Sequence, residues 1–249
     1  MAITPQEVTF ILLGAAAGGF INGLAAFGTA LFALGFFLTV MPPVQAVTIT
    51  VTLAVLTGVQ GVWLVRHTMF DNGARLARFV VPGVIGIPLG VWSLSLINVQ
   101  ALKLIIAFFL ILYGGYFSLR TRLPKIRERT PLIDAAVGFI GGVLGGAASL
   151  SGALPTMWCS LRGWPKMETR AVLQPYNFVV LSLTGIMLAL GGAYTVQTLT
   201  FLALAVPTAL LSAYVGIWVF GKISDALFRR LLISLTLVSG LVLLIRELL

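Results

Sequence analysis

The sequence predicts an all-α protein that crosses a membrane several times and consists of two inverted repeats. Hydrophobic residues make up 59% of the 249 residues and charged residues only 9%, whereas about a quarter of a soluble domain is charged. The mean hydropathy is +1.07, and apolar runs of roughly 20 residues, enough to cross a bilayer, recur along the whole chain. A glycine-rich apolar stretch near the start of each half indicates the duplication.

The apolar runs define four segments in each half of the chain. The first repeat is expected to cover residues 1–123 and the second residues 132–249, with a basic cytoplasmic connector at 124–131 between them. In each repeat a broken, glycine-rich helical hairpin is followed by three transmembrane helices. The expected segments are 8–40, 44–65, 78–97 and 100–119, then 132–160, 171–190, 196–220 and 226–246.

Short matches in the same order support the duplication. Gly19-Phe20-Ile21 matches Gly138-Phe139-Ile140 at the start of each half, and Gly90-Val91-Trp92 matches Gly216-Ile217-Trp218 further along. Any one match could arise by chance among apolar residues, but an ordered series indicates a repeat.

The first segment of each half is predicted to be a re-entrant hairpin. Some 33 residues of continuous helix would extend about 50 Å, which exceeds the hydrocarbon thickness, yet two full crossings would need about 40 residues and a turn. Glycines within Gly18–Leu31 and Gly138–Pro155 weaken a helix in mid-segment. Two short helices that meet at the glycines fit both facts. The alternative is one long tilted helix whose glycines allow close packing.

The distribution of positive charge favours the hairpins. If both first segments are hairpins, Lys103 and Arg246 alone of the sixteen Lys and Arg residues lie outside the cell. The connector would then be cytoplasmic, both termini would lie outside, and the halves would be inverted relative to each other. The expected location is the cell inner membrane.

Several functional classes find no support in the residues. The chain has one cysteine, Cys159, and one histidine, His67, and it lacks a P-loop, a zinc-binding histidine pair and a GxSxG motif. We therefore expect no enzymatic activity, no metal and no cofactor. The net charge of +9 lies mainly in short loops, so it indicates topology rather than nucleic-acid binding.

The polar residues near the two breaks suit a small anion. No carboxylate lies near a predicted midplane, whereas glycine-exposed N–H groups and the N-termini of half-helices attract negative charge. The polar candidates are Asn22, Thr29 and Thr52 in the first half and Ser149, Ser151, Gln174, Tyr176 and Asn177 in the second. Each of these residues could instead bond its own helix or join neighbouring helices. Arg162, Lys166 and Arg170 could form a cytoplasmic vestibule for anions or could only fix the topology.

The two glycine-rich stretches, GFINGLAAFGTAL from Gly19 and GFIGGVLGGAASLSGALPTM from Gly138, resemble the sulfite exporter TauE/SafE family of membrane permeases. The resemblance covers essentially the whole chain. It implies a transporter of sulfite or of organosulfonates such as sulfoacetate. By position, the glycine motif of that family falls on Gly23, Gly28, Gly145, Gly146 and Gly152.

The resulting hypothesis is a secondary transporter that moves a small sulfur-containing anion by alternating access, with its site between the two breaks. A passive anion channel and a membrane subunit that supports a partner enzyme are the alternatives. The expected partners are the anionic substrate and the lipid bilayer. Protons could travel on a weakly acidic substrate, because the spans offer no carboxylate relay. The residues indicate no oligomeric state.

Overall fold

The computed structural model describes residues 4–93, 99–119, 126, 128–148 and 150–248. Ser149 and residues 124, 125 and 127 of the basic connector therefore lie outside the described residues. Regular structure in the described part is helical, apart from one bridge between Ile126 and Arg162. The helices are α1 (Pro5–Ala25), α2 (Thr29–Leu38), α3 (Pro43–Asp71), α4 (Gly73–Ser93), α5 (Val99–Ser118), α6 (Pro131–Ala148), α7 (Ala153–Leu161), α8 (Lys166–Leu190), α9 (Val196–Lys222) and α10 (Asp225–Leu248).

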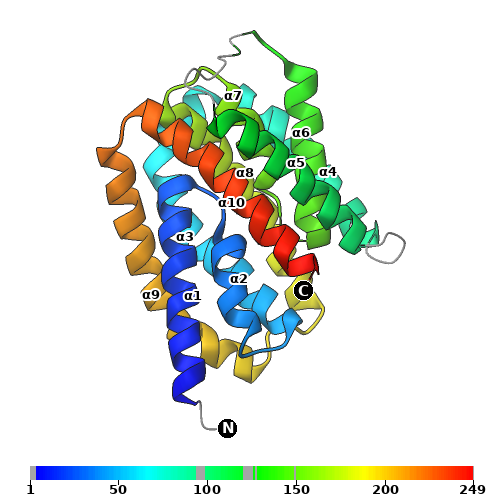
Figure 1. Cartoon of the computed structure of the whole chain (residues 1–249), viewed down its shortest axis with the longest axis vertical. Helices are drawn as coiled ribbons and strands as arrows, with labels where there is room; N and C mark the ends of the chain where they lie inside the picture. Colours follow the sequence, from blue (N-terminus) through cyan, green and yellow to red (C-terminus); the bar gives the residue numbers. More distant parts are fainter. Residues whose placement is uncertain (1–3, 94–98, 120–125, 127, 149, 249) are drawn as a thin grey trace.

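The first segment of each half is broken into two helices, so the alternative of one long tilted helix is wrong. Between α1 and α2 the backbone of Ala26 (φ 69°) and Gly28 (φ 93°) is left-handed, which ends one helix and reverses the chain before the next. Figure 1 shows α2 running back beside α1. Between α6 and α7 the chain breaks before Gly152, the N-cap of α7.

The two helices of each hairpin differ in length. With 21 residues, α1 extends about 32 Å and matches the hydrocarbon thickness, whereas the ten residues of α2 extend about 15 Å. The expectation of two short helices was therefore wrong for α1. A capping box fixes its start, because Thr4 and Glu7 satisfy each other's backbone N–H groups.

Most of the glycines expected at the first break instead allow helices to touch. In α1, Gly19 and Gly23 face Ala209 and Ala213 of α9, where an added Cβ would strike the α9 backbone. In α6, Gly138 and Gly142 face α4 at Phe79 and Gly83 in the same way. Close van der Waals packing at these contacts holds the helices together in lipid, where the hydrophobic effect does not drive their association.

These contacts link the halves crosswise, because the first helix of each half packs against the fourth helix of the other. Gly216 of α9 lies against the α1 backbone at Phe20 to Leu24, and Gly86 of α4 lies against α6 at Phe139 to Val143. Gly86 is therefore the counterpart of Gly216, not Gly90 as the sequence match suggested. In Figure 1, α1 begins at the lower end of the molecule and α6 at the upper end. An inverted repeat requires this arrangement, and inversion itself stays a prediction.

The composition of the helices identifies a multi-pass membrane protein. Within the described residues, five helices are long and apolar enough to cross a bilayer, namely α1, α3, α4, α8 and α9. Large apolar side chains such as Trp63, Leu211 and Trp218 are exposed on the outer surface. In water such a surface would be unfavourable, whereas in lipid it is the ordinary exterior.

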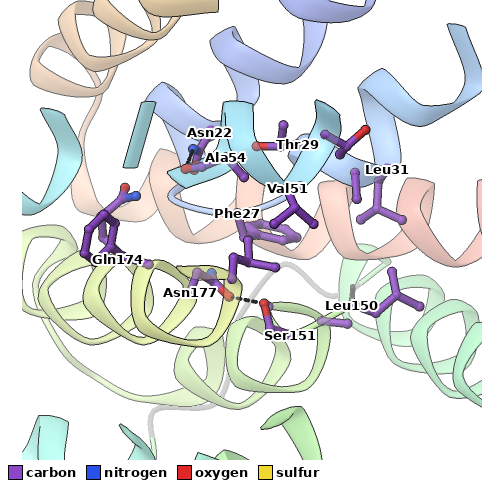
Figure 2. A pocket seen from close by; sticks show the side chains of 17 residues that line it. Asn22, Phe27, Thr29, Leu31, Val51, Ala54, Leu150, Ser151, Gln174 and Asn177 are labelled. Atoms are coloured by element: carbon purple, nitrogen blue, oxygen red, sulfur yellow. Dashed lines mark hydrogen bonds between the residues drawn. The ribbon is translucent and has the colours of Figure 1, made fainter. Parts of the chain in front are cut away.

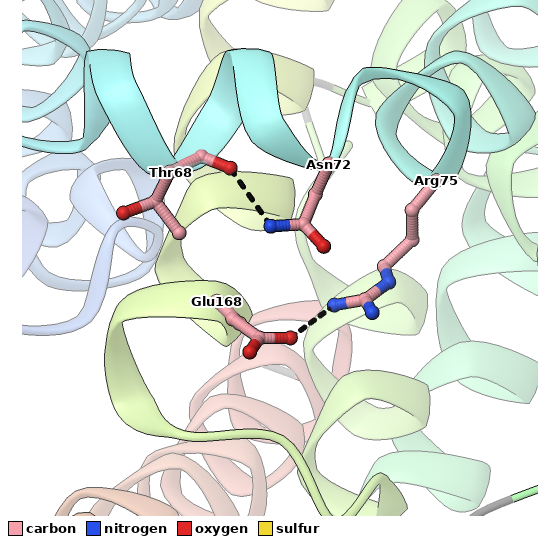
Figure 3. A network of polar contacts seen from close by, with 4 residues as sticks. All are labelled: Thr68, Asn72, Arg75 and Glu168. Carbon is pink, nitrogen blue, oxygen red and sulfur yellow. Dashed lines mark hydrogen bonds and ion pairs between the residues drawn. The ribbon is translucent and has the colours of Figure 1, made fainter.

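Polar contacts join three turns at the upper end of the molecule. Arg75, at the start of α4, forms an ion pair with Glu168 in the first turn of α8, as Figure 3 shows. The Lys166 ammonium donates to the backbone carbonyls of Phe220 and Ile223 and so caps the end of α9. The α3–α4, α7–α8 and α9–α10 turns, which carry many of the basic residues, therefore share one end.

A matched pair of glycines in α9 tests the glycine packing. Gly216→Ala should lower the free energy of unfolding by about 1–3 kcal/mol, because its methyl group would strike the α1 backbone. Gly221→Ala should leave stability unchanged or slightly higher, since nothing lies within 4 Å of its added Cβ. Thermal unfolding in detergent measures both variants, and equal melting temperatures would contradict this role of Gly216.

Candidate functional site

A buried cavity lies where the two helix breaks meet. About 540 Å³ of empty space, including the part that opens outward, lies between α1, α2, α3, α7 and α8. Its polar side chains are all deeply buried, none more than 5% exposed. Figure 2 shows them converging on the space from both halves of the chain. The lining residues are Asn22, Phe27, Gly28, Thr29, Ala30, Leu31, Thr50, Val51, Ala54, Leu150, Ser151, Gly152, Ala153, Gln174, Asn177, Phe178 and Leu181.

Two helices begin at this cavity. The wall includes Gly28, the N-cap of α2, and Gly152, the N-cap of α7, together with the residues that follow each of them. The first N–H groups of a helix lack intrahelical acceptors and carry a partial positive charge. Two such N-termini, one from each half, therefore face the same small space and favour an anion there.

Asn177 of α8 connects the two breaks through its side-chain amide. Its Nδ2 donates to the carbonyl oxygen of Ala26 at 3.0 Å, and its Oδ1 accepts from the hydroxyl of Ser151 at 2.9 Å. A Cβ on Gly152 would lie 3.0 Å from both of these amide atoms and 2.9 Å from the Cβ of Phe27. The absence of a side chain at position 152 therefore makes room for the Asn177 amide.

Asn22 of α1 makes the equivalent connection between the first break and α3. Its Nδ2 donates to the hydroxyl of Thr57 at 2.6 Å and to the carbonyl oxygen of Ala54 at 3.1 Å. The hydroxyl of Thr50 donates to Ala46 in its own helix, the alternative that the sequence left open for each hydroxyl residue. Asn22 and Thr29 both line the cavity.

Gln174 reaches from the cavity wall to a buried arginine. Its Oε1 accepts from Nη2 of Arg170 at 3.2 Å. Gly61 of α3 provides the room for this side chain, because a Cβ there would collide with the Gln174 amide. Arg170 itself is 0% exposed and lies inside the molecule, at the side of the cavity that faces the basic turns.

The structure brings seven of the predicted binding residues to the cavity wall and places five others elsewhere. Those on the wall are Asn22, Gly28, Thr29, Ser151, Gly152, Gln174 and Asn177. Gly23 lies in the α1–α9 contact, and Gly145 packs against Val180 and Ser151. Thr52 bonds its own helix and Tyr194, and Tyr176 donates to Gly138. Gly146 belongs to α6 and is not on the wall, while Ser149 lies outside the described residues.

The other two residues assigned to a cytoplasmic vestibule are engaged with the protein. Arg162 donates to the hydroxyl of Thr130 and stacks on Trp158 and Trp164, and Lys166 caps α9 as described above. Both residues line a second, smaller pocket at the upper end of the molecule. These contacts favour a structural role for the pair over a free basic entrance.

Sequence reasoning missed the apolar part of the wall. Phe27, Phe178 and Leu181 line the cavity beside the polar groups. Nothing distinguishes them from other apolar residues in a membrane segment, although Phe27 stands within the first break. Within the described residues no group of His, Cys, Asp and Glu side chains could hold a metal ion.

Comparison with known proteins identifies the family. The model of the sulfite exporter TauE/SafE family matches residues 10–243, nearly the whole chain. The chain belongs to this family. As a TauE/SafE protein it is a membrane transporter. No curated protein and no solved structure matched the chain.

The Tyr176→Phe variant tests whether Tyr176 stabilises the helix packing or binds the substrate. The variant should lose about 1 kcal/mol of stability, because the hydroxyl of Tyr176 donates to the carbonyl oxygen of Gly138 at 2.7 Å. Its apparent affinity for a transported anion should stay within twofold of the unmodified protein, since Tyr176 does not line the cavity. Thermal unfolding and the KM of transport measure the two effects, and a large rise in KM at unchanged stability would place Tyr176 in the site.

Proposed function

We propose that this TauE/SafE protein is a secondary transporter of a small sulfur-containing anion, sulfite or an organosulfonate, which binds in the cavity between the two helix breaks. The observation that carries the proposal is the convergence of two helix N-termini on one buried space. Asn22, Thr29, Ser151, Gln174 and Asn177 add amide and hydroxyl groups to the same wall. Helix N–H groups with side-chain donors suit the oxygens of a sulfonate.

The charge of the cavity wall favours the binding of anions over cations. The residues that line the cavity include no Asp or Glu, so a cation would find only carbonyl, amide and hydroxyl oxygens. The partial positive charge of two helix N-termini would oppose a cation and stabilise an anion. Phe27, Phe178 and Leu181 can accept a short apolar tail or exclude water around a bare oxyanion.

Alternating access is the transport mechanism that the crosswise arrangement of the halves supports. In this proposal the two halves are inverted, the connector is cytoplasmic, and both termini lie outside the inner membrane. The Arg75–Glu168 pair and the Lys166 cap hold α4, α8 and α9 together at the end with the basic turns. Opening that end would require these contacts to separate while the site stays between the breaks.

Two other functions remain as outcomes of the test. A passive anion channel could use the same cavity, but its flux would rise linearly with concentration. A membrane subunit that supports a partner enzyme would move no anion in liposomes. The deep burial of the polar wall favours a carrier, because a carrier encloses its substrate during transport.

A substrate panel tests the proposed function directly. Purified protein in liposomes should take up sulfite or an anionic organosulfonate with saturable kinetics and should discriminate against taurine, sulfate and carboxylates. Flux is followed with labelled anions, and protein-free liposomes are the control. Preference for carboxylates or cations would contradict the assigned substrate class, and flux linear in concentration would favour the channel.

Variants at the second break test the location of the site. Asn177→Ala and Ser151→Ala should each raise the KM for the best substrate by about tenfold, because each removes a charge-stabilising or positioning hydrogen bond worth roughly 1–2 kcal/mol. Ser212→Ala in α9 and Ser234→Ala in α10 are matched controls, as neither serine lines the cavity. Equal effects of all four variants would place the site elsewhere.

A further inference from the structure

Arg170 is a buried cation without a protein counter-charge. Its side chain is 0% exposed, and no acidic side chain of the described residues lies within ion-pair distance of it. Neighbouring acids have other partners, because Glu168 pairs with Arg75 and Asp225 accepts from the backbone of Lys166. A buried charge is normally paired, since isolation from water otherwise makes it costly.

The contacts of Arg170 satisfy its guanidinium only in part. Nη1 donates to the carbonyl oxygen of Leu24 at 3.3 Å, Nη2 donates to Gln174, and the Phe220 ring lies 4.5 Å from Cζ. The Nε atom is buried and has no hydrogen-bond partner. The contact with the Leu24 carbonyl oxygen could serve only to cap the end of α1. A neutral donor would be enough for such a cap, so capping does not explain an unpaired full charge in the interior.

The charge lies directly behind the cavity. Gln174 separates Arg170 from the open space, since its side chain contacts the guanidinium and also lines the wall. Leu24, the other partner, precedes the first break, and Phe27 and Gly28 of that break also line the wall. An anion in the cavity therefore lies one side chain away from this guanidinium, in surroundings that screen charge weakly.

We propose that Arg170 supplies the one full positive charge of the anion site and that the transported species is a monovalent oxyanion. This inference rests on the proposed function and makes its substrate class narrower. The cavity wall contributes neutral amides, hydroxyls and helix N–H groups, and Arg170 contributes a charge of +1. A monovalent anion balances the charge of Arg170, whereas the second charge of a divalent anion would be opposed only by the partial charges of the two helix N-termini.

Net charge distinguishes chemically similar sulfur compounds as substrates of this site. Hydrogen sulfite and methanesulfonate carry one negative charge, whereas sulfite and sulfoacetate carry two when fully ionised. A transporter that moves hydrogen sulfite also moves the proton on its substrate. Proton movement would then need no carboxylate in the spans, which agrees with the composition of the cavity wall.

The test compares Arg170→Gln and Arg170→Lys with the unmodified full-length protein. Lys222→Gln is the control, because Lys222 is an exposed charge at the end of α9, stacked on Trp218. Binding is measured as the rise in melting temperature with methanesulfonate, with its neutral isostere dimethyl sulfone and with sulfoacetate. Uptake of labelled methanesulfonate into liposomes is measured in parallel, after size-exclusion chromatography has shown that each variant is monodisperse.

The unmodified protein and Lys222→Gln should bind methanesulfonate at least about tenfold more tightly than dimethyl sulfone or fully ionised sulfoacetate. Arg170→Gln should lose this preference, with a methanesulfonate KM raised about tenfold or more, and Arg170→Lys should restore part of it because the charge returns. Uptake of sulfite by the unmodified protein should fall as the pH rises and hydrogen sulfite loses its proton, whereas methanesulfonate uptake should not.

Two results would overturn the proposal. One is an Arg170→Gln variant that keeps its affinity for methanesulfonate and its preference over dimethyl sulfone within twofold. The other is tighter binding of fully ionised sulfoacetate than of methanesulfonate by the unmodified protein. Absence of any flux would instead reject the proposed transport function, and the melting-temperature shifts would still decide the role of Arg170. If Arg170→Gln does not fold, the preference is decided on Arg170→Lys and the unmodified protein.

Discussion

The side-chain amide of Asn177 is the interaction on which the central architecture depends. A helix break within an apolar bundle exposes backbone groups that neither lipid nor a regular helix can satisfy. Asn177 accepts from Ser151 at one break and donates to the carbonyl of Ala26 at the other. One amide therefore satisfies polar groups of both breaks and joins them. The cavity lies between these two irregular segments.

Glycine packing between the halves makes that connection possible. Because α1 packs against α9 and α6 packs against α4 through glycine contacts, each hairpin is embedded in the helices of the other half. Neither break could keep its position if the halves separated as independent domains. In the proposed alternating access, relative movement of these interlocked helices would change access to the site from either side.

The electrostatics of the site depend on position as well as on composition. Two helix N-termini provide partial charge at the wall, and Arg170 provides a full charge one side chain behind it. The Gln174 side chain contacts Arg170 and also lines the wall, in a space that Gly61 leaves free. The proposed substrate is a sulfur oxyanion, and the geometry explains how a chain without an acidic residue on the cavity wall could hold one. Lys166 and Arg75 at that end instead stabilise helix ends and turns.

The sequence by itself determined that the protein is a helical bundle in a membrane and that Ser151, Gln174 and Asn177 are candidates for the site, and it predicted a broken first segment in each half. These features follow from hydropathy, from segment length and from the rarity of polar residues in apolar helices. Only the tertiary structure decided that the first break lies at Ala26–Gly28 and that Gly19 and Gly23 contact α9. A glycine that breaks a helix and one that permits close packing look the same in a sequence. The burial of Arg170 was equally undetermined, because a residue one turn inside a helix lies at the surface or in the interior according to the neighbouring helices that cover it.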